Sequence, residues 1–339
     1  MTNLGLIQRL RQRIGGPKSV ELPVSYYGKL PIYKDFLREN LAGKEAQAFK
    51  HWLDRGISHF WSAREATRGQ TIEPHAFLLR FPGTGRHVVG CLWGSHDEGG
   101  LRFFPFSIFV SLPADRDVFP SHSVLEVLAP VIEAGHRWRL ESSGLRTLRD
   151  CVQWTQSLAL HVNMSPEYMV TEDLLTRAEE ITVHEYTSSL WGEKAVLEWP
   201  ALLAYLDRYR HRIGTHAHSA DLAARFPSST SLPLVLQTHF LSFIVERFDC
   251  RRDRPFQLFL PISPGLSGIA VFLRNLRSED VFAFHPDLPA YEHLEDFRES
   301  IPRGKEDEVK PLTEAEGKLP LRAVLDPGFR ASSNSPDQG

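Results

Sequence analysis

The chain has 339 residues, of which 42% are hydrophobic and 24% are charged, a balance typical of a soluble globular protein with one large domain or two ordinary ones. Its 39 basic and 42 acidic residues give a formal net charge of −3, which excludes a global attraction to nucleic acid or to anionic membranes. Cys91, Cys151 and Cys250 lie far apart and form no CxxC pair. We therefore expect a reducing compartment, with neither a disulfide framework nor a zinc site built from thiols.

The first segment, residues 1–19, is expected to form an amphipathic helix and a linker. Its apolar residues recur at helical spacing between arginines: Leu4, Ile7, Leu10 and Ile14. The segment lacks the apolar region and the cleavage site of a signal peptide. No stretch of the chain reaches the roughly 20 apolar residues of a membrane span. Two interpretations stay open: a docking or frayed terminus, or a helix that binds a membrane surface or a partner.

An amphipathic helix is predicted where apolar side chains recur every three or four positions: Phe49, Trp52, Leu53, Ile57, Phe60 and Trp61. Two strands are predicted next, over 75–81 and 87–93, as a hairpin around the turn PGTGR. A third strand follows over 101–113, where Phe104, Phe106, Ile108, Val110 and Leu112 alternate on one side. We expect Pro105 at a strand start, an edge or a bulge. We also expect Trp52 and Trp61 to be buried against this third strand.

The second half mixes helical patterns at 124–138, 199–209 and 236–244 with strand patterns at 255–263 and 268–276. We expect Pro130 to kink or end the first of these helices. The predicted fold is α/β, a layered sandwich of a mixed, partly antiparallel sheet flanked by helices. A first α/β domain is expected over 20–160 and a second α/β half over 161–302. Residues 303–339 are expected to form a largely flexible tail, in which 319–325 is the segment able to dock.

No pattern in the sequence assigns a catalytic residue, a metal ligand or a cofactor. His216 and His218 have a spacing that metals use, but no nearby carboxylate or cysteine completes a ligand set. The glycines of GTGRHV precede a predicted strand rather than a helix, so a dinucleotide site is not supported. GxSxG and GxxxxGK[ST] are absent.

The most informative segment is SYYGKLPIYKDFLREN, residues 25–40, which fits neither a plain helix nor a plain strand. It resembles the start of the TagF (ImpM) family, accessory proteins of bacterial type VI secretion. That family opens with glycine-lysine-leucine-proline, then two variable residues and glycine-aspartate-phenylalanine. The residues that match are Gly28, Lys29, Leu30, Pro31, Asp35 and Phe36, with Trp52 on the following helix and Phe104 and Pro105 on a later strand. Lys34 stands where the family usually has glycine, so the turn must differ or carry strain if that glycine has a positive φ.

The resemblance implies a TagF-like layered α/β sandwich and a cytoplasmic regulator without known catalysis. Proteins of this family repress secretion after translation through a forkhead-associated scaffold protein, often beside a kinase and phosphatase pair. The implied partners are therefore that scaffold and members of the kinase and phosphatase pathway, with no cofactor, no nucleic acid and no membrane insertion. Two alternatives stay open: an enzyme of unassigned class with a pocket between the two halves, and a structural secretion subunit.

Two interpretations of residues 25–40 also stay open. The segment is a packed turn with its aromatics under the helix at 49–61, or it is a surface that faces a partner, with Tyr33, Lys34 and Arg38 exposed. The candidate partner-binding residues are Tyr26, Tyr27, Lys29, Tyr33, Lys34 and Arg38. We expect Asp35 to cap a short helix, DFLREN.

Overall fold

The structure is a computed structural model that describes residues 19–62, 72–113, 128–163, 179–215, 222–228, 237–238, 240–241, 256–262, 268–284, 294–303, 310–321 and 323. The predicted N-terminal helix and the pair His216 and His218 lie outside the described residues.

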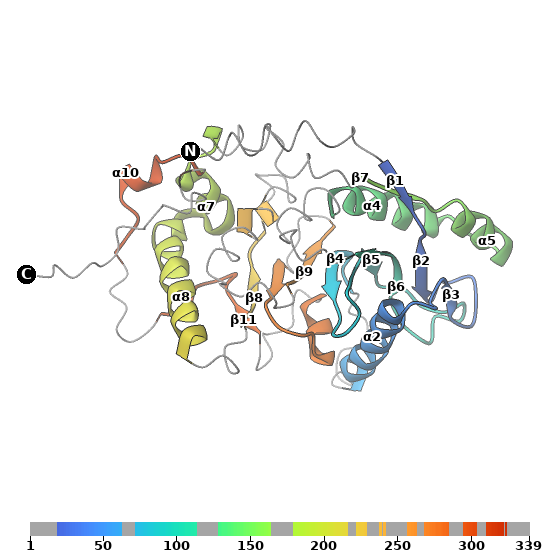
Figure 1. The fold of residues 1–339 in the computed structure, drawn as a ribbon. Coiled ribbons are helices and arrows are strands. Elements are labelled where there is room, and N and C mark those ends of the chain that lie inside the picture. The colour runs from blue at the N-terminus through green and yellow to red at the C-terminus, as the bar shows by residue number, and fades with distance from the viewer. Residues whose placement is uncertain are drawn as a thin grey trace, which may run out of the picture.

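A nine-stranded mixed sheet joins strands from both halves of the chain (Figure 1). Its strand order is β11-β8-β10-β9-β4-β5-β6-β2-β3, and each neighbouring pair is antiparallel except β11 and β8. The strands are β2 (Ser25–Gly28), β3 (Leu37–Glu39), β4 (His75–Arg80), β5 (Arg86–Trp93), β6 (Phe106–Pro113), β8 (Ala223–Phe226), β9 (Gln257–Pro261), β10 (Ile269–Phe272) and β11 (Glu295–Asp296). A separate pair is formed by β1 (Ser19–Leu22) and β7 (Leu160–Asn163).

Helices cover both faces of this sheet, and Figure 1 shows α2 and α4 on opposite sides of β4, β5 and β6. The helices are α2 (Lys44–Ser62), α4 (Ala129–Ser143), α5 (Leu148–Gln156), α7 (Val183–Trp191), α8 (Ala195–Thr215) and α10 (Glu314–Gly317), with the 3₁₀ helices η3 (Gly192–Lys194) and η4 (Ser278–Phe284). The predicted α/β sandwich with a mixed, partly antiparallel sheet is therefore confirmed.

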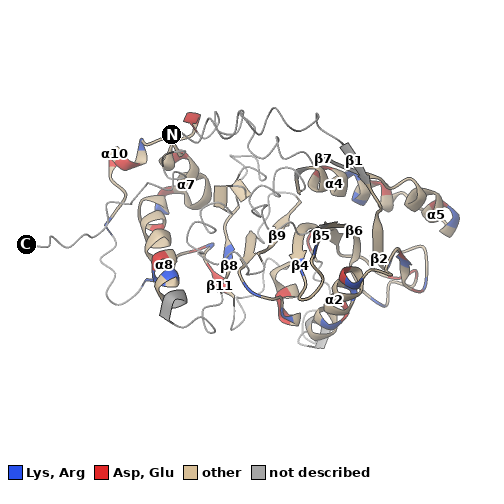
Figure 2. Cartoon of the chain, in the orientation of Figure 1, with Lys and Arg blue, Asp and Glu red and all other residues tan. Residues whose placement is uncertain are grey.

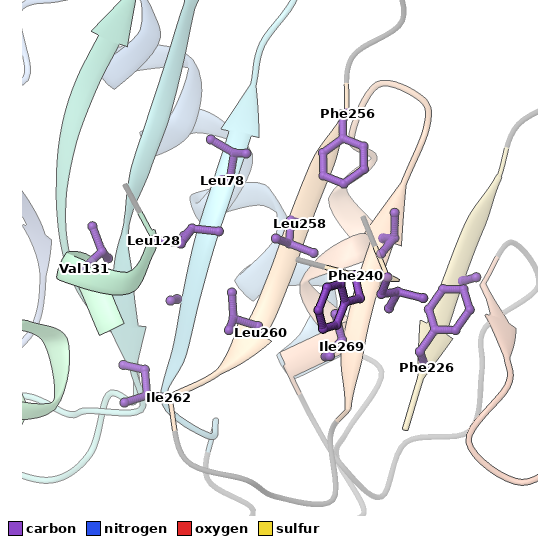
Figure 3. Packing of buried hydrophobic residues seen from close by; sticks show 14 of the residues in the cluster. Leu78, Leu128, Val131, Phe226, Phe240, Phe256, Leu258, Leu260, Ile262 and Ile269 are labelled. Carbon is purple, nitrogen blue, oxygen red and sulfur yellow. The ribbon is translucent and has the colours of Figure 1, made fainter. Parts of the chain in front are cut away.

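Each face of the sheet has its own hydrophobic core, because alternate strand residues point to opposite sides. On β6, Phe106, Ile108 and Val110 pack with the α4, α7 and α8 side, whereas Phe109 packs with the α2 side. The first of these cores crosses both halves of the chain. Figure 3 shows residues that β4, β9, β10 and β8 contribute to it: Leu78, Leu258, Leu260, Ile269 and Phe226.

The positions of Phe104, Pro105, Pro130 and Leu321 can be compared with the expectations. Phe104 packs on the α2 side rather than with Phe106, because β6 begins only at Phe106, after Pro105. Pro105 at the strand start is as predicted. Pro130 stands in the first turn of α4, where a proline removes no hydrogen bond, and residues 124–127 of the predicted helix lie outside the described residues. Leu321, in the segment 319–325 expected to be able to dock, is buried, and its N–H donates to the Ile181 carbonyl at 2.7 Å.

Trp52 is buried, as predicted, but its neighbours are not those expected. Its indole stacks on Phe259 of β9 at a centroid distance of 5.9 Å and an interplanar angle of 11°. Its Nε1–H donates to the Arg277 carbonyl at 2.8 Å. Phe49, one turn earlier on α2, packs against β6, with its ring centroid 4.7 Å from that of Phe109. The side chain of Trp61 lies outside the described part of α2.

Replacing Trp52 with alanine should lower the free energy of unfolding by about 3–5 kcal/mol, because a buried ring and its hydrogen bond are lost from the contact of α2 with β9. Urea denaturation followed by circular dichroism measures this change. The control is Leu101→Ala, at a side chain that is 86% exposed. The control should stay within about 0.5 kcal/mol of the wild type. Equal stability of the two variants would contradict the placement of α2.

Candidate partner-binding cleft

Gly28 fixes the path of the chain at the end of β2. Tyr26 and Tyr27 pair with Ile108 and Ser107 of β6, and Gly28 follows with a φ of +143°. A Cβ atom at Gly28 would lie 2.1 Å from the Pro105 carbonyl oxygen, closer than any side chain can come. The glycine of the GKLP motif is thus required both for its φ and for its close approach to the next strand.

The segment after Gly28 is a turn followed by a strand. The Tyr33 N–H donates to the Leu30 carbonyl at 3.2 Å, which closes a turn with Pro31 at its second position, where proline is favoured. The expected short helix DFLREN is wrong, because β3 pairs with β2 and continues the sheet edge instead. Asp35 caps no helix. Its Oδ1 accepts a hydrogen bond from the Phe36 N–H at 2.8 Å.

Lys34 causes no left-handed strain, although the related family usually has glycine there. Among the described non-glycine residues, only Asn40 has a positive φ, of 53°. The Lys34 carbonyl accepts hydrogen bonds from Lys29 Nζ, at 3.3 Å, and from Arg102 Nη2. The turn is therefore held through a backbone group that any residue at position 34 supplies.

Three aromatic rings form the floor of the site. Tyr27 and Phe36 stack with their centroids 5.3 Å apart and an interplanar angle of 9°, and Phe104 meets Phe36 edge-on at 4.9 Å. An ammonium group lies over each ring of the stacked pair: Lys29 Nζ is 4.5 Å from the Phe36 centroid and Lys50 Nζ is 4.9 Å from the Tyr27 centroid. Cations over ring faces are attracted by the ring quadrupole.

Two carboxylates are held firmly beside these rings. Asp54 of α2 accepts from the Tyr27 hydroxyl at 2.6 Å and pairs with Lys50 at 2.6 Å. Burial and this hydrogen bond raise the pKa of Tyr27. Asp97 accepts from Arg102 Nε at 2.6 Å and from the N–H groups of Leu101 and Arg102. The hydrogen bond from the Arg102 side chain is the main cause that lowers the pKa of Asp97 to about 2.

These elements enclose a cleft of about 610 Å³ between α2, the 28–38 segment and the loop that joins β5 to β6. Its charged lining residues are Lys29, Asp35, Arg38, Lys50, Asp54 and Arg102. Four of these six are basic, so the lining carries an excess of positive charge. Figure 2 shows basic residues on α2 and on the loop that follows β2.

The six candidate residues divide into two groups. Lys34 and Arg38 are exposed, and Tyr26 and Tyr33 are half-buried. Tyr27 and Lys29 are only 3% and 2% exposed, although both line the cleft. The segment is thus a packed turn through its buried residues, and it also presents an exposed cationic rim.

Some residues of the cleft were not predicted from the sequence. Lys50 and Asp54 come from the polar flank of α2, and Arg102 and Phe103 come from the β5–β6 loop. The spacing of four residues between Lys50 and Asp54 was the available signal, since such a pair meets on one helix face. Trp52, a motif residue, is not part of the lining, because it packs against β9.

The described ranges of the chain contain no group of three or more His, Cys, Asp or Glu residues placed to hold a metal ion. No helix within those ranges has the length and apolar character needed to cross a bilayer.

Part of the chain matches a known family model. Residues 25–158 match the family model described as the TagF N-terminal domain, Type VI secretion system-associated. Among solved structures, the crystal structure of PA0076 from Pseudomonas aeruginosa PAO1 is similar, with 22% sequence identity and a TM-score of 0.35. The similar region covers 40% of this chain and 62% of PA0076, which is less than two thirds of that protein. No match is found among curated proteins.

Replacing Gly28 with alanine should destabilise the fold far more than the same change at Gly83. Both glycines have a positive φ, of 143° and 72°, but no atom lies within 4 Å of a Cβ at Gly83. Gly83→Ala should therefore cost only about 1 kcal/mol of backbone strain. Gly28→Ala also forces β2 away from Pro105 and should cost at least about 2 kcal/mol more. Equal melting temperatures for the two variants would contradict this.

Asp97 should contribute to the stability of the fold above about pH 4 and lose that contribution as the pH falls toward 2. Its folded pKa, about 2, is below the ordinary value of 3.8, so the unfolded chain takes up the proton first on acidification. Asp97→Asn should be less stable than the wild type at neutral pH, and the difference should shrink through this window. Urea denaturation at stepped pH tests this, with Glu299→Gln as a control at an exposed carboxylate. A constant difference between wild type and Asp97→Asn at every pH would contradict the assignment.

Proposed function

Because residues 25–158 carry a TagF N-terminal domain, associated with type VI secretion, we propose that this protein is a non-enzymatic negative regulator of that system. It acts after translation, in the cytoplasm, by binding a forkhead-associated scaffold protein. The family match is the observation that carries the proposal. We propose no separate function for the second half of the chain, 161–302. It contributes strands to the same sheet.

The surface around the cleft supports a binding role. Lys34 and Arg38 are exposed next to an aromatic floor, and Phe103 on the opposite rim is 49% exposed. Exposed aromatic and arginine side chains in one place are typical anchors of protein interfaces. A partner surface of about 800 Å² per side would extend beyond the cleft over this rim.

Two carboxylates favour binding over acid–base chemistry: Asp54 in the lining of the cleft, and Asp97, which pairs with the lining residue Arg102. Asp54 is engaged by the Tyr27 hydroxyl and by Lys50, and Asp97 is engaged by Arg102 and by two backbone N–H groups. The lowered pKa of Asp97 keeps it ionised at neutral pH, whereas a general acid or base needs a pKa near the working pH. These groups therefore have structural partners that a catalytic role would have to displace.

The double variant Lys34→Glu with Arg38→Glu should bind the scaffold at least about tenfold more weakly than the wild type, because it reverses two charges at the rim. The loss should lie mainly in the association rate, and binding should respond less to salt than in the wild type. Biolayer interferometry at two salt concentrations measures both effects, and circular dichroism checks folding.

The matched control is Arg139→Glu with Lys310→Glu, which reverses two exposed charges on α4 and near α10, away from the cleft. This control should bind as the wild type does. Unchanged binding by the folded rim variant removes residues 34–38 from the interface. If the wild type binds no such scaffold, and deletion of the protein leaves secretion unchanged, the proposed function is wrong. Stable co-purification with the secretion apparatus, without an effect on its activity, would favour a structural subunit instead.

A further inference from the structure

Lys29 is a buried cation without a carboxylate partner in the described part of the chain. Its side chain is 2% exposed, and its Nζ lies over the Phe36 ring and donates to the Lys34 carbonyl at 3.3 Å. Lysine is almost never buried unless it is paired, because the charged form loses its hydration. Burial and the nearby Arg102 lower the pKa of Lys29. The ammonium therefore occupies a position that a bound anion would stabilise.

The charges of Asp97 and Asp35 act on Lys29, but no described carboxylate forms an ion pair with it, and Asp35 Oδ1 accepts a hydrogen bond from the Phe36 N–H instead. Asp97 is held by Arg102, and Asp54 by Lys50 and Tyr27. Arg38 lines the same cleft and is exposed, and its guanidinium group makes no hydrogen bond or ion pair with a described residue. Lys29 and Arg38 are thus two cations of one cleft, one at the floor and one at the rim, and neither forms an ion pair with a described carboxylate.

The β5–β6 loop, which supplies part of the cleft lining, also carries exposed apolar side chains. Phe103 belongs to the cleft lining and is 49% exposed, and Leu101 on the same loop is 86% exposed. The Leu101 N–H is bonded to Asp97, so the ion pair of Asp97 with Arg102 fixes the loop that carries both apolar residues. A ligand that places an anion between Lys29 and Arg38 would therefore meet an apolar surface beside it.

We propose that the cleft binds an acidic segment of a protein partner, with one carboxylate between Lys29 and Arg38 and a neighbouring apolar residue on Leu101 and Phe103. The proposal rests on the proposed function only in that the partner is a protein. It adds the chemistry that the partner presents. Carboxylates and phosphates both suit a lysine and an arginine, and the carboxylate is favoured here because only one cation of the pair lies at the buried floor.

The test uses the full-length protein and a fluorescein-labelled peptide, Gly-Ser-Leu-Glu-Asp-Leu-Gly-Ser-Gly. Fluorescence anisotropy should show binding that weakens as salt is added. A peptide with Gln and Asn in place of Glu and Asp should bind at least about tenfold more weakly. Equal binding of the two peptides, or no binding of the acidic peptide up to about 1 mM, overturns the proposal. Tight binding of a phosphothreonine peptide, but not of the acidic peptide, also overturns it and assigns the cleft to phosphate.

Two variants locate the site. Lys29→Met keeps a long apolar side chain over Phe36 and removes the charge, and Arg38→Gln removes the charge at the rim. Each should weaken the acidic peptide about tenfold, whereas Arg139→Gln, at an exposed arginine on α4, should leave binding unchanged. Lys29→Met should melt no lower than the wild type, because the buried charge that it removes is itself unfavourable. Full binding by folded Lys29→Met overturns the proposal.

Parallel measurements with the forkhead-associated scaffold separate this inference from the proposed function. In one outcome the acidic peptide binds, Lys29→Met abolishes that binding, and the scaffold does not bind at all. The proposal that the cleft binds an acidic segment is then supported, and the proposed partner is wrong. If the scaffold binds the wild type and Lys29→Met equally, the cleft proposal is wrong and the regulatory proposal stands.

Discussion

The fold depends on the pairing of β4 with β9, because this ladder joins the two halves of the chain into one sheet. His75 to Leu78 lie opposite Pro261 to Leu258, and the side chain of Gln257 extends the contact by accepting from the Arg80 N–H at 2.9 Å and donating to the Arg274 carbonyl at 3.0 Å. Trp52 closes the same seam on one face by stacking on Phe259. Because the hydrophobic core extends across the β4–β9 contact, each half buries apolar surface against the other. The stabilities of the two halves are therefore coupled. The two parts of the chain expected on either side of residue 160 therefore contribute strands to one common sheet.

A second constraint, the close approach of Gly28 to Pro105, connects this sheet to the cleft. It holds the start of the 28–38 segment against β6, so the next residue, Lys29, is directed over Phe36. The buried Tyr27 and the exposed Arg38 then belong to adjacent strands in register with each other. The same turn therefore buries Tyr27 and exposes Arg38. The two interpretations of this segment, a packed turn and a partner surface, are compatible.

The parts of the fold that could be predicted are those with a local pattern. The helix at 49–61 and the strands of the first half follow from periodicity, and the structure confirms them as α2, β4, β5 and β6. The failures concern contacts between distant residues. DFLREN has apolar and charged residues that suit a helix, but its backbone completes the sheet edge beside β2. Trp52 finds its partners at Phe259 and Arg277, more than 200 residues away, which no window along the chain reveals. Part of the cleft could be predicted from the sequence: the segment 25–40 supplies Lys29, Phe36 and Arg38, whereas Lys50 and Arg102 come from other elements.

Lys34 is the one departure from the family motif between Gly28 and Phe36. Its backbone and its side chain have different roles. Its carbonyl oxygen accepts hydrogen bonds from Lys29 Nζ and Arg102 Nη2, so the buried Lys29 and Arg102 of the β5–β6 loop are held at the same backbone group. A glycine would supply the same carbonyl, and the φ at Lys34 is not in the region that favours glycine. The lysine side chain is exposed and is therefore free of the packing that fixes its backbone. The substitution leaves the turn intact and adds a positive charge to a rim that already carries Arg38. A change of this kind alters the electrostatic attraction of a partner without altering the shape that the partner meets.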